Sequence, residues 1–446
     1  MSLTPVTWRA LERVRISPPD ERAPPFQPGA SRSLAMVPNS LALIATKVAT
    51  LGLGFLFWLV AARVFAPQQV GLAGGVVAAV LLCVQFALLG VGSAVIAMYP
   101  EHSATPARLL DTALTTSVLA GAVVGLGFAA LAGGAFAELR VVGSQPAYVA
   151  LFVVMTALGT AGVVLDQIST TLRRGDQALV RGVLNGILSL AAVAALALIS
   201  GAGSMAIFAC WVLGVAAASA LGAVQLRATV ARYSYRPRME RSLIRHLVAV
   251  GLPNHALTLA DRAPGLLLPV LVTELLSPTA NAYWYTVWMM AWVVFIIPVQ
   301  VGMTLFAEAS HRPEAIDALV RHAVRWSLAI GVVASAALAL GGGIVLSVLG
   351  ARYAAAGTGP LRALVCGLVP MAYIQAYYAR CRAAARLREA VATAVVGGTL
   401  TVAAATAAGV ASGLTAMAVA WVAAQAVAGV WAAIRLRTLS RAAVAA

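Results

Sequence analysis

Charged side chains are scarce in this chain, and lysine is nearly absent. Only 10% of the 446 residues are charged, while 61% are hydrophobic and the mean hydropathy is +0.91. This composition excludes a soluble globular protein and indicates an integral membrane protein. Lys47 is the single lysine, so arginine supplies nearly all of the cations behind the formal net charge of +16.

Cysteine is also rare. Cys83, Cys210, Cys366 and Cys381 lie far apart, in or at the ends of apolar runs. Their spacing is not that of a metal site or a disulfide framework, so we expect packing roles for them and predict no metal and no cofactor. The histidines are isolated, and no glycine-rich loop for a nucleotide phosphate occurs. The sequence therefore predicts neither an enzyme nor direct use of ATP.

Apolar runs long enough to cross a bilayer make up most of the chain. Six of them lie between residues 37 and 226, and six more lie between residues 247 and 435. We therefore predict an all-α integral membrane protein with about twelve transmembrane helices, arranged in two pseudo-twofold-related six-helix lobes around a central cavity. The predicted lobes cover residues 36–226 and 246–437.

Polar segments flank and join the two predicted lobes. Residues 1–35 combine several prolines with scattered charge, so we expect a disordered cytoplasmic tail there. The basic segment 227–245 is the expected cytoplasmic connection between the lobes, and residues 438–446 form a second expected cytoplasmic tail. Twenty-five arginines fall in segments on one side of the membrane and three on the other. This asymmetry predicts a multi-pass protein of a bacterial cytoplasmic membrane with both termini in the cytoplasm.

One short pattern occurs twice, once in each predicted lobe. A Pro-Asn pair ending at Asn39 precedes Lys47 by eight residues, and a second pair ending at Asn254 precedes Arg262 by the same interval. At ~1.5 Å of rise per helical residue, each cation lies roughly 15 Å from the start of its span. That depth is near the midplane of a hydrocarbon core ~30 Å thick. The duplication predicts a parallel repeat with a substrate path between the lobes.

Several short stretches resemble a known group of transporters. They are Leu59-Val60-Ala61-Ala62-Arg63-Val64-Phe65-Ala66-Pro67-Gln68-Gln69-Val70-Gly71, Leu88-Leu89-Gly90-Val91-Gly92, Phe306-Ala307-Glu308-Ala309-Ser310 and Leu349-Gly350-Ala351-Arg352-Tyr353. In this order they resemble the polysaccharide-exporter and flippase branch of the multidrug/oligosaccharidyl-lipid/polysaccharide (MOP) superfamily, the group of the Wzx-type flippases. The resemblance covers residues 37 to about 437. One position departs from it, because Phe306-Ala307 stands where many relatives have an aromatic residue followed by proline.

The resemblance implies a transporter whose V-shaped cavity opens alternately to the two sides of the membrane. It also implies a substrate class, an undecaprenyl-pyrophosphate-linked oligosaccharide that is moved to the outer leaflet for cell-envelope polysaccharides such as lipopolysaccharide. The partners expected on this basis are the lipid-linked oligosaccharide, membrane lipids, a coupling proton or sodium ion, and a glycan polymerase or glycosyltransferases. No nucleic acid is expected.

Lys47 and Arg262 are the leading candidates for substrate binding. A cation at mid-membrane is costly and persists mainly where it faces a cavity or a partner. A cationic lumen suits a pyrophosphate, which arginine grips through two hydrogen bonds and lysine meets as a point charge. A second interpretation stays open, in which Asp261 and Asp166 neutralise the two cations inside the bundle, with Lys47 paired across the lobes to Asp261. Asp261 and Asp166 are also the candidates for coupling or gating.

The remaining polar candidates lie toward the predicted cytoplasmic side. Asp166 is a candidate coupling site, but an ion pair with Arg173 or Arg174 is the favoured interpretation. Asn39 and Asn254 are candidate substrate contacts, with hydrogen bonds to nearby backbone as the favoured alternative.

Aromatic side chains gather in the eighth apolar run. Tyr283, Trp284 and Tyr285 are predicted to form an interfacial belt at the outer surface of the membrane. Trp288 and Trp292 are deeper and one helical turn apart, so they are the aromatic candidates for substrate binding in the lumen.

Three functions compete at this stage. The favoured one is a flippase for a lipid-linked oligosaccharide. A cation-coupled multidrug antiporter of the same superfamily is disfavoured, because a cationic drug requires a net acidic lumen and the mid-span cations here outnumber Asp261. The third is a non-transporting membrane scaffold of a glycan-synthesis complex.

Overall fold

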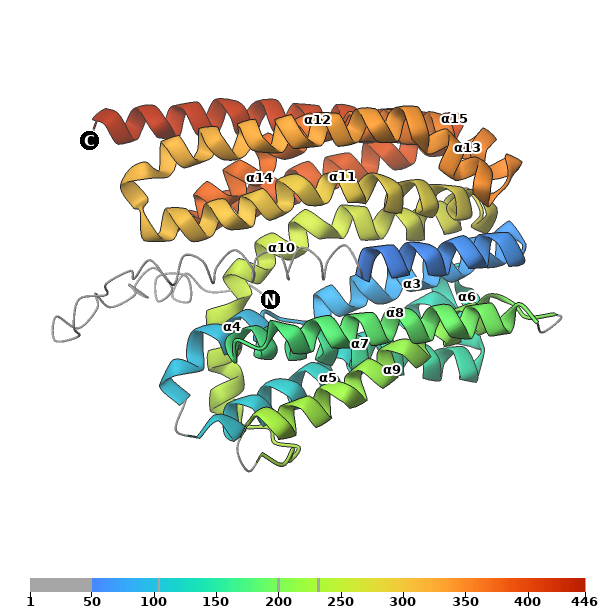
Figure 1. Cartoon of the computed structure of the whole chain (residues 1–446), viewed down its shortest axis with the longest axis horizontal. Helices are drawn as coiled ribbons and strands as arrows, with labels where there is room; N and C mark the ends of the chain where they lie inside the picture. The colour runs from blue at the N-terminus through green and yellow to red at the C-terminus, as the bar shows by residue number, and fades with distance from the viewer. Residues whose placement is uncertain (1–49, 103–104, 199–200, 231–232, 446) are drawn as a thin grey trace.

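The computed structural model describes residues 50–102, 105–198, 201–230 and 233–445, and nearly all of these residues are helical (Figure 1). Nine of the described helices are long and apolar enough to cross a membrane. A pair of shorter helices, α13 (Ala351–Val365) and α14 (Leu368–Ala383), forms a further span that is bent by 46°.

The first group of helices forms the N-terminal lobe. It contains Thr50–Val64, α3 (Pro67–Ala87), α4 (Val91–Met98), α5 (Pro106–Ala135), α6 (Arg140–Ser144), α7 (Pro146–Thr171), α8 (Gly175–Leu196) and α9 (Ser204–Thr229). Within this lobe α3 is interior and α8 peripheral, since 78% of the apolar window of α3 is buried against 17% for α8.

The second group forms the C-terminal lobe. It contains α10 (Arg241–Leu275), α11 (Pro278–His311), α12 (Ile316–Leu349), α13, α14 and α15 (Leu387–Ala445). Gly413 has a left-handed φ of 83° and divides α15 into two helices, so α15 supplies two spans. With the shorter first helix included, the described segments agree with the predicted number of about twelve spans. The predicted all-α membrane fold is therefore confirmed.

Proline sets the start of several helices. Pro67, Pro106, Pro146 and Pro278 each occupy the first turn of a helix, where the backbone N–H that proline lacks has no intrahelical partner. At α11 the Ser277 hydroxyl also accepts a hydrogen bond from the N–H of Ala280 at 3.0 Å. Two of these helices, α3 and α11, pack against each other between the lobes.

A sharp turn interrupts the apolar run that contains α3 and α4. Leu89 and Gly90 have left-handed φ values of 47° and 78°, and they separate α3 from α4. A side chain at Gly90 would collide with the backbone of Gly251 on α10. Glycine at position 90 therefore serves two purposes, the left-handed turn and the close approach of the two lobes.

α10 belongs to both lobes. Its beginning packs on α4 and α5, whereas its later part packs on α3 as well as on α11 and α15. Figure 1 shows it crossing from one group of helices to the other. His255 Nε2 on α10 donates a hydrogen bond to the carbonyl of Gln85 on α3 at 2.8 Å. Interior prolines at positions 253, 264 and 269 do not end the helix, as is common for helices that neighbouring spans support.

The segment before α10 is attached to the N-terminal lobe. The Tyr233 hydroxyl donates to the buried carboxylate of Asp111 at 2.7 Å. Arg108 forms an ion pair with Glu240 at 2.7 Å, and the hydrogen bonds from Arg108 lower the pKa of Glu240. These contacts hold the start of α10 at the end of the N-terminal lobe that is predicted to face the cytoplasm.

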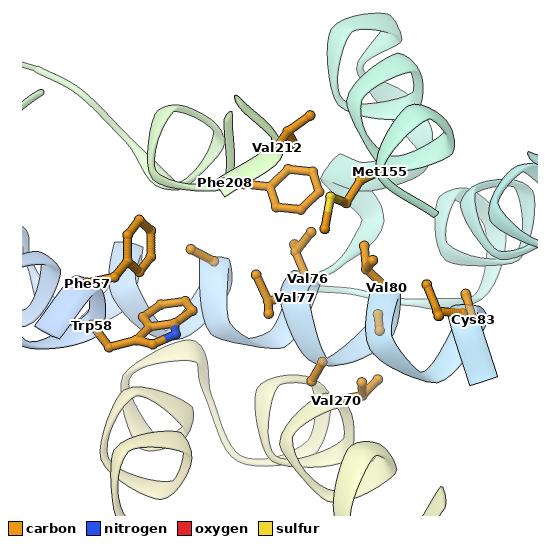
Figure 2. Close-up of a cluster of buried hydrophobic side chains, with 14 of the residues drawn as sticks. Phe57, Trp58, Val76, Val77, Val80, Cys83, Met155, Phe208, Val212 and Val270 are labelled. Atoms are coloured by element: carbon orange, nitrogen blue, oxygen red, sulfur yellow. The ribbon is translucent and has the colours of Figure 1, made fainter. Parts of the chain in front are cut away.

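The hydrophobic core is continuous across the lobes. Figure 2 shows α3 at its centre, with Val76, Val77, Val80 and Cys83 facing side chains from several other helices. Those neighbours are Phe57 and Trp58 from the first helix, Met155 from α7, Phe208 and Val212 from α9, and Val270 from α10.

Polar contacts join the lobes at the opposite end, which is predicted to face outward. The Glu274 carboxylate at the end of α10 accepts hydrogen bonds from the backbone N–H groups of Ala137, Glu138 and Leu139 at 2.8, 3.2 and 2.6 Å. Nearby, Asn281 Nδ2 on α11 donates to the carbonyl of Gly71 on α3 at 2.8 Å. The lobes are therefore closed against each other at this end, where α3 and α11 begin (Figure 1).

We predict that Gly71→Ala destabilises this closed arrangement. The added methyl group would collide with the carbonyl of Pro278, and such overpacking typically costs about 1 to 3 kcal/mol. The matched control is Gly162→Ala on α7, where the space is open and alanine gains about 1 kcal/mol of helix propensity. Thermal unfolding of the purified protein in detergent should show a lower Tm for Gly71→Ala and an unchanged or higher Tm for Gly162→Ala. Equal Tm values for the two variants would contradict the close contact.

Candidate functional site

Two cavities flank the middle of α10. The larger one, here called the inter-lobe cavity, has a volume of about 280 Å³ and lies between the two lobes. The first helix and α3 form one side of it through Leu51, Phe55, Ala78, Leu81 and Gln85, and α10 and α11 form the other through Arg262, Gly265, Leu266, Pro269, Tyr285, Trp288, Met289, Trp292 and Val293. Its volume lies just below the range usual for ligand sites, roughly 300 to 1,000 Å³.

The second cavity lies within the C-terminal lobe and is here called the C-lobe cavity. Its volume is about 50 Å³, and α10, α11, α14 and α15 line it. Its polar lining includes Asp261, Arg262, Tyr378, Thr393 and Gln425.

A short wall separates the two cavities, because Arg262, Gly265, Trp288 and Trp292 line both of them. Gly265 lets the Trp288 indole lie against α10, since a methyl group at that position would approach the ring to 2.6 Å. Trp288 also meets Trp421 on α15 edge to face, with ring centroids 5.4 Å apart. The ring is thus held in place by α10 and α15.

Arg262 is the only charged residue among the described residues that line the inter-lobe cavity. It is exposed there, and no ion pair joins it to another described residue. Mid-membrane cations are usually kept for a cavity or a partner. An exposed guanidinium in a cavity whose other lining residues, Gln85 apart, are apolar or aromatic is suited to bind an anion.

Asp261 is held by a neutral partner. Gln375 Nε2 on α14 donates to both carboxylate oxygens of Asp261, at 3.0 and 3.2 Å. Both residues are at least partly buried. An amide that reaches across from another helix fixes the orientation of the carboxylate and leaves its charge uncancelled.

A second arginine of this region, Arg382 on α14, was not recognised from the sequence. In the sequence it is one of four arginines between residues 380 and 388, a segment predicted to face the cytoplasm. In the structure its side chain turns back into the protein, where Nη2 donates to Thr258 Oγ1 on α10 at 3.2 Å. Asp261 and Arg262 lie within electrostatic range of its guanidinium. Its spacing one turn after Tyr378 was the available signal.

The structure brings together four of the sequence candidates. Arg262, Asp261, Trp288 and Trp292 all line the C-lobe cavity. Asn254 is half-buried and lines neither cavity. Lys47 and Asn39 lie outside the described residues, so their predicted roles stay predictions.

Asp166 lies away from both cavities, and its ion pair differs from the expected one. It pairs with the buried Arg181 at 2.7 Å, while Arg174 pairs with Asp176 at 2.9 Å. The expectation of a pair with Arg173 or Arg174 is corrected accordingly. Arg181 lies on α8, the next helix, and its side chain is buried in the helix bundle. Arg173 and Arg174 lie in the turn before α8 and are exposed.

The expected outer belt of Tyr283, Trp284 and Tyr285 is also corrected. Trp284 is fully buried and stacks on Trp288 with ring centroids 6.0 Å apart. Tyr285 lines the inter-lobe cavity and meets Trp58 of the other lobe at 5.0 Å. The reason is the central position of α11, which packs on α3, α10, α12, α13 and α14 and so has protein neighbours on most sides.

Across the part of the chain that the structure describes, no group of three His, Cys, Asp or Glu side chains has an arrangement that could hold a metal ion.

Comparison with known proteins identifies the fold. No protein-family model and no curated protein sequence matches the chain. Among solved structures, an inward-facing multidrug resistance MATE transporter of the MOP superfamily matches with a TM-score of 0.65 and 16% identity, over 88% of this chain and 96% of that one. The lipid II flippase MurJ, in an inward closed conformation, matches with a TM-score of 0.70 and 13% identity, over 88% of this chain and 87% of that one.

A third solved structure also matches the chain. It is a MOP superfamily transporter from Pyrococcus furiosus Vc1, described as having a binding pocket of reverse polarity, with a TM-score of 0.55, 15% identity and coverage of 90% and 95% of the two chains. At these identities the likeness establishes the fold. The fold implied by the sequence resemblance is therefore confirmed, while membership of the MOP superfamily and of its Wzx-type branch stays a prediction.

We predict that Gln375 and Asp261 are energetically coupled. Gln375→Leu leaves a partly buried carboxylate without its donor, which typically costs about 1 to 3 kcal/mol, so the Tm should fall. In the double variant Asp261→Leu/Gln375→Leu neither group is left unpaired, and the Tm should recover most of that loss. Gln300→Leu on the exposed face of α11 is the control and should change the Tm little. The single variant Asp261→Leu completes the comparison. If the Tm changes of Gln375→Leu and Asp261→Leu add up to the change in the double variant, the pair is not coupled.

Proposed function

We propose that the protein is a flippase that carries an undecaprenyl-pyrophosphate-linked oligosaccharide across the cytoplasmic membrane for cell-envelope polysaccharide synthesis. The observation that carries this proposal is the position of Arg262, the sole charged residue among the described lining of the inter-lobe cavity. The proposal covers the substrate class, the direction from the cytoplasmic to the outer leaflet, and alternating access through a cationic lumen.

The chemistry of the cavity fits such a substrate. A pyrophosphate in a region of low dielectric requires a cation, and a guanidinium offers two parallel hydrogen bonds to phosphate oxygens. The lining around Arg262 is apolar and aromatic, with Trp288 and Trp292 beside it. Indole faces stack on sugar rings, and the aliphatic lining suits an isoprenoid chain. Lys47, Asn39 and Asn254 remain proposed contacts of the same substrate.

The fold of the neighbours supports a transport role. MurJ is named as a lipid II flippase, and the MATE structures are named as multidrug resistance transporters. A membrane protein with this fold and an inter-lobe cavity is better explained by transport than by a scaffold role, because a scaffold has no use for a cation exposed to such a cavity.

The multidrug antiporter remains the second candidate, and Asp261 is the observation that favours it. Its carboxylate lines the C-lobe cavity and is suited to bind a proton, a sodium ion or a cationic drug. The charge balance opposes a cationic drug, since Arg262 lines both cavities and Arg382 is also near Asp261. We therefore propose Asp261, and not Asp166, as the coupling site of the flippase.

The proposed cycle follows from the contacts between the lobes. Substrate would enter at the end predicted to face the cytoplasm, with its pyrophosphate drawn to Arg262. Opening at the other end requires the hydrogen bonds of Glu274 and of Asn281 to break, because both join the two lobes there. Occupation of Asp261 by a coupling ion would change the charge next to Arg262. It would in this way shift the equilibrium between the arrangements of the lobes that open to the two sides of the membrane.

We predict that Arg262→Gln lowers the rate of translocation at least tenfold, because a hydrogen bond to a charged group contributes about 1.5 to 3 kcal/mol. Arg262→Lys should retain part of the activity, since it keeps the charge and loses the two-pronged geometry. The control is Arg362→Gln, an arginine within the α13 span that bonds to the carbonyl of Ala339 and lines neither cavity. The measurement is the movement of a fluorescent undecaprenyl-pyrophosphate oligosaccharide across the membrane of proteoliposomes.

Two outcomes would contradict the proposal. One is a normal translocation rate for Arg262→Gln. The other is the absence of lipid translocation by the unaltered protein together with proton- or sodium-driven export of a cationic dye, which would favour the multidrug antiporter.

A further inference from the structure

Arg382 is an inward-turned cation with weak partners. Besides the hydrogen bond to Thr258, its Nη1 approaches the sulfur of Met303 on α11 at 3.5 Å. Its Nε atom is buried and has no hydrogen-bond partner. No described carboxylate forms an ion pair with it. A hydroxyl and a thioether are poor compensation for a guanidinium that has lost part of its hydration.

The arginines around it are paired conventionally. Arg380, two residues earlier on α14, forms an ion pair with Asp317 and a hydrogen bond to Ser440. Arg435 binds Glu389 through two nitrogens, at 2.6 and 3.1 Å, and Arg386 reaches the same carboxylate at 3.5 Å. The local structure therefore supplies carboxylates to the arginines that stabilise it. Arg382 is different, because no described carboxylate pairs with its guanidinium.

Its position relative to Arg262 is set by α10. Thr258, which accepts from Arg382, precedes Arg262 by four residues, so the two lie on one face of the helix, ~6 Å apart. On α14, Arg382 follows Tyr378 of the C-lobe cavity by one turn. Two guanidinium groups thus succeed each other from the predicted cytoplasmic end toward the middle of the membrane.

Neutralising Asp261 is the alternative role for Arg382, and the geometry argues against it. Gln375 occupies both carboxylate oxygens of Asp261. Arg382 is close enough to feel the charge of Asp261, yet its hydrogen bonds go to Thr258 and Met303. A residue whose role was to cancel Asp261 would be expected to make the direct contact.

We propose that Arg382 is a second anion-binding residue and that Arg262 and Arg382 together recognise a diphosphate. This inference rests on the proposed function and deepens it. A diphosphate offers two phosphoryl groups, so it can engage both guanidinium groups at once, with Arg382 as the first contact from the cytoplasmic side. A monophosphate offers one group and gains little from the second arginine. The pair of arginines would therefore select for diphosphate over monophosphate lipids.

The test measures binding of two soluble probes, farnesyl diphosphate and farnesyl monophosphate, to the full chain in lipid nanodiscs. Arg382→Gln should weaken binding of the diphosphate about tenfold and of the monophosphate less than about threefold, as expected for the loss of one hydrogen-bonded charged contact. Arg386→Gln, which removes a charge from the same end of the protein, is the control and should leave both affinities unchanged. Arg382→Lys should give an intermediate loss for the diphosphate, and it serves if Arg382→Gln does not fold.

The possible failures are distinguishable. If Arg262→Gln weakens binding of farnesyl diphosphate and Arg382→Gln does not, this inference is wrong while the proposed function stands. Equal weakening of both probes by Arg382→Gln would reduce Arg382 to a general electrostatic effect and would also overturn the inference. If the unaltered protein binds neither probe, the proposed function fails, and the role of Arg382 fails with it.

Discussion

The cost of an arginine inside the hydrocarbon core is the constraint on which the arrangement around α10 depends. A charge at that depth costs several kcal/mol unless it meets water, a partner or a cavity. Arg262 meets this requirement because α10 and α11 from one lobe, and the first helix and α3 from the other, leave a cavity of about 280 Å³ beside it. Its neighbour Asp261 instead turns to Gln375. Two adjacent charges of opposite sign are thus kept apart, and the guanidinium stays available for an anion.

α10 and α11 make this arrangement possible through unusual positions. α10 begins against the N-terminal lobe, where Gly90 and Gly251 allow the backbones to touch. It packs on α11 and α15 of the C-terminal lobe, and at its end Glu274 bonds to the N-terminal lobe again. Any rearrangement of the lobes therefore moves the helix that carries Asp261 and Arg262. α11 is enclosed by other helices, and its tryptophans form the wall between the two cavities. A change at one end of the lobes can in this way reach the charged pair.

The parts of the structure that depend on one helix at a time were predictable from the sequence, and those that depend on neighbours were not. Run length and charge predicted the spans, and the position of Arg262 well inside an apolar run marked it as a candidate. The hydrogen bonds between Gln375 and Asp261 join residues 114 positions apart, and a single sequence without related sequences contains no signal for such a contact. Arg382 was hidden because it stands among arginines that set topology. Trp284 was misplaced because an outer belt and a central helix have the same local composition.

The central claim is that the inter-lobe cavity binds the diphosphate of a polyprenyl lipid through Arg262. Its most direct test is an electron cryomicroscopy structure of the full chain in nanodiscs containing undecaprenyl pyrophosphate. The account predicts diphosphate density between the lobes, within hydrogen-bond distance of the Arg262 guanidinium and beside Trp288 and Trp292. Diphosphate density bound elsewhere, with an empty inter-lobe cavity and Arg262 unchanged, would contradict it.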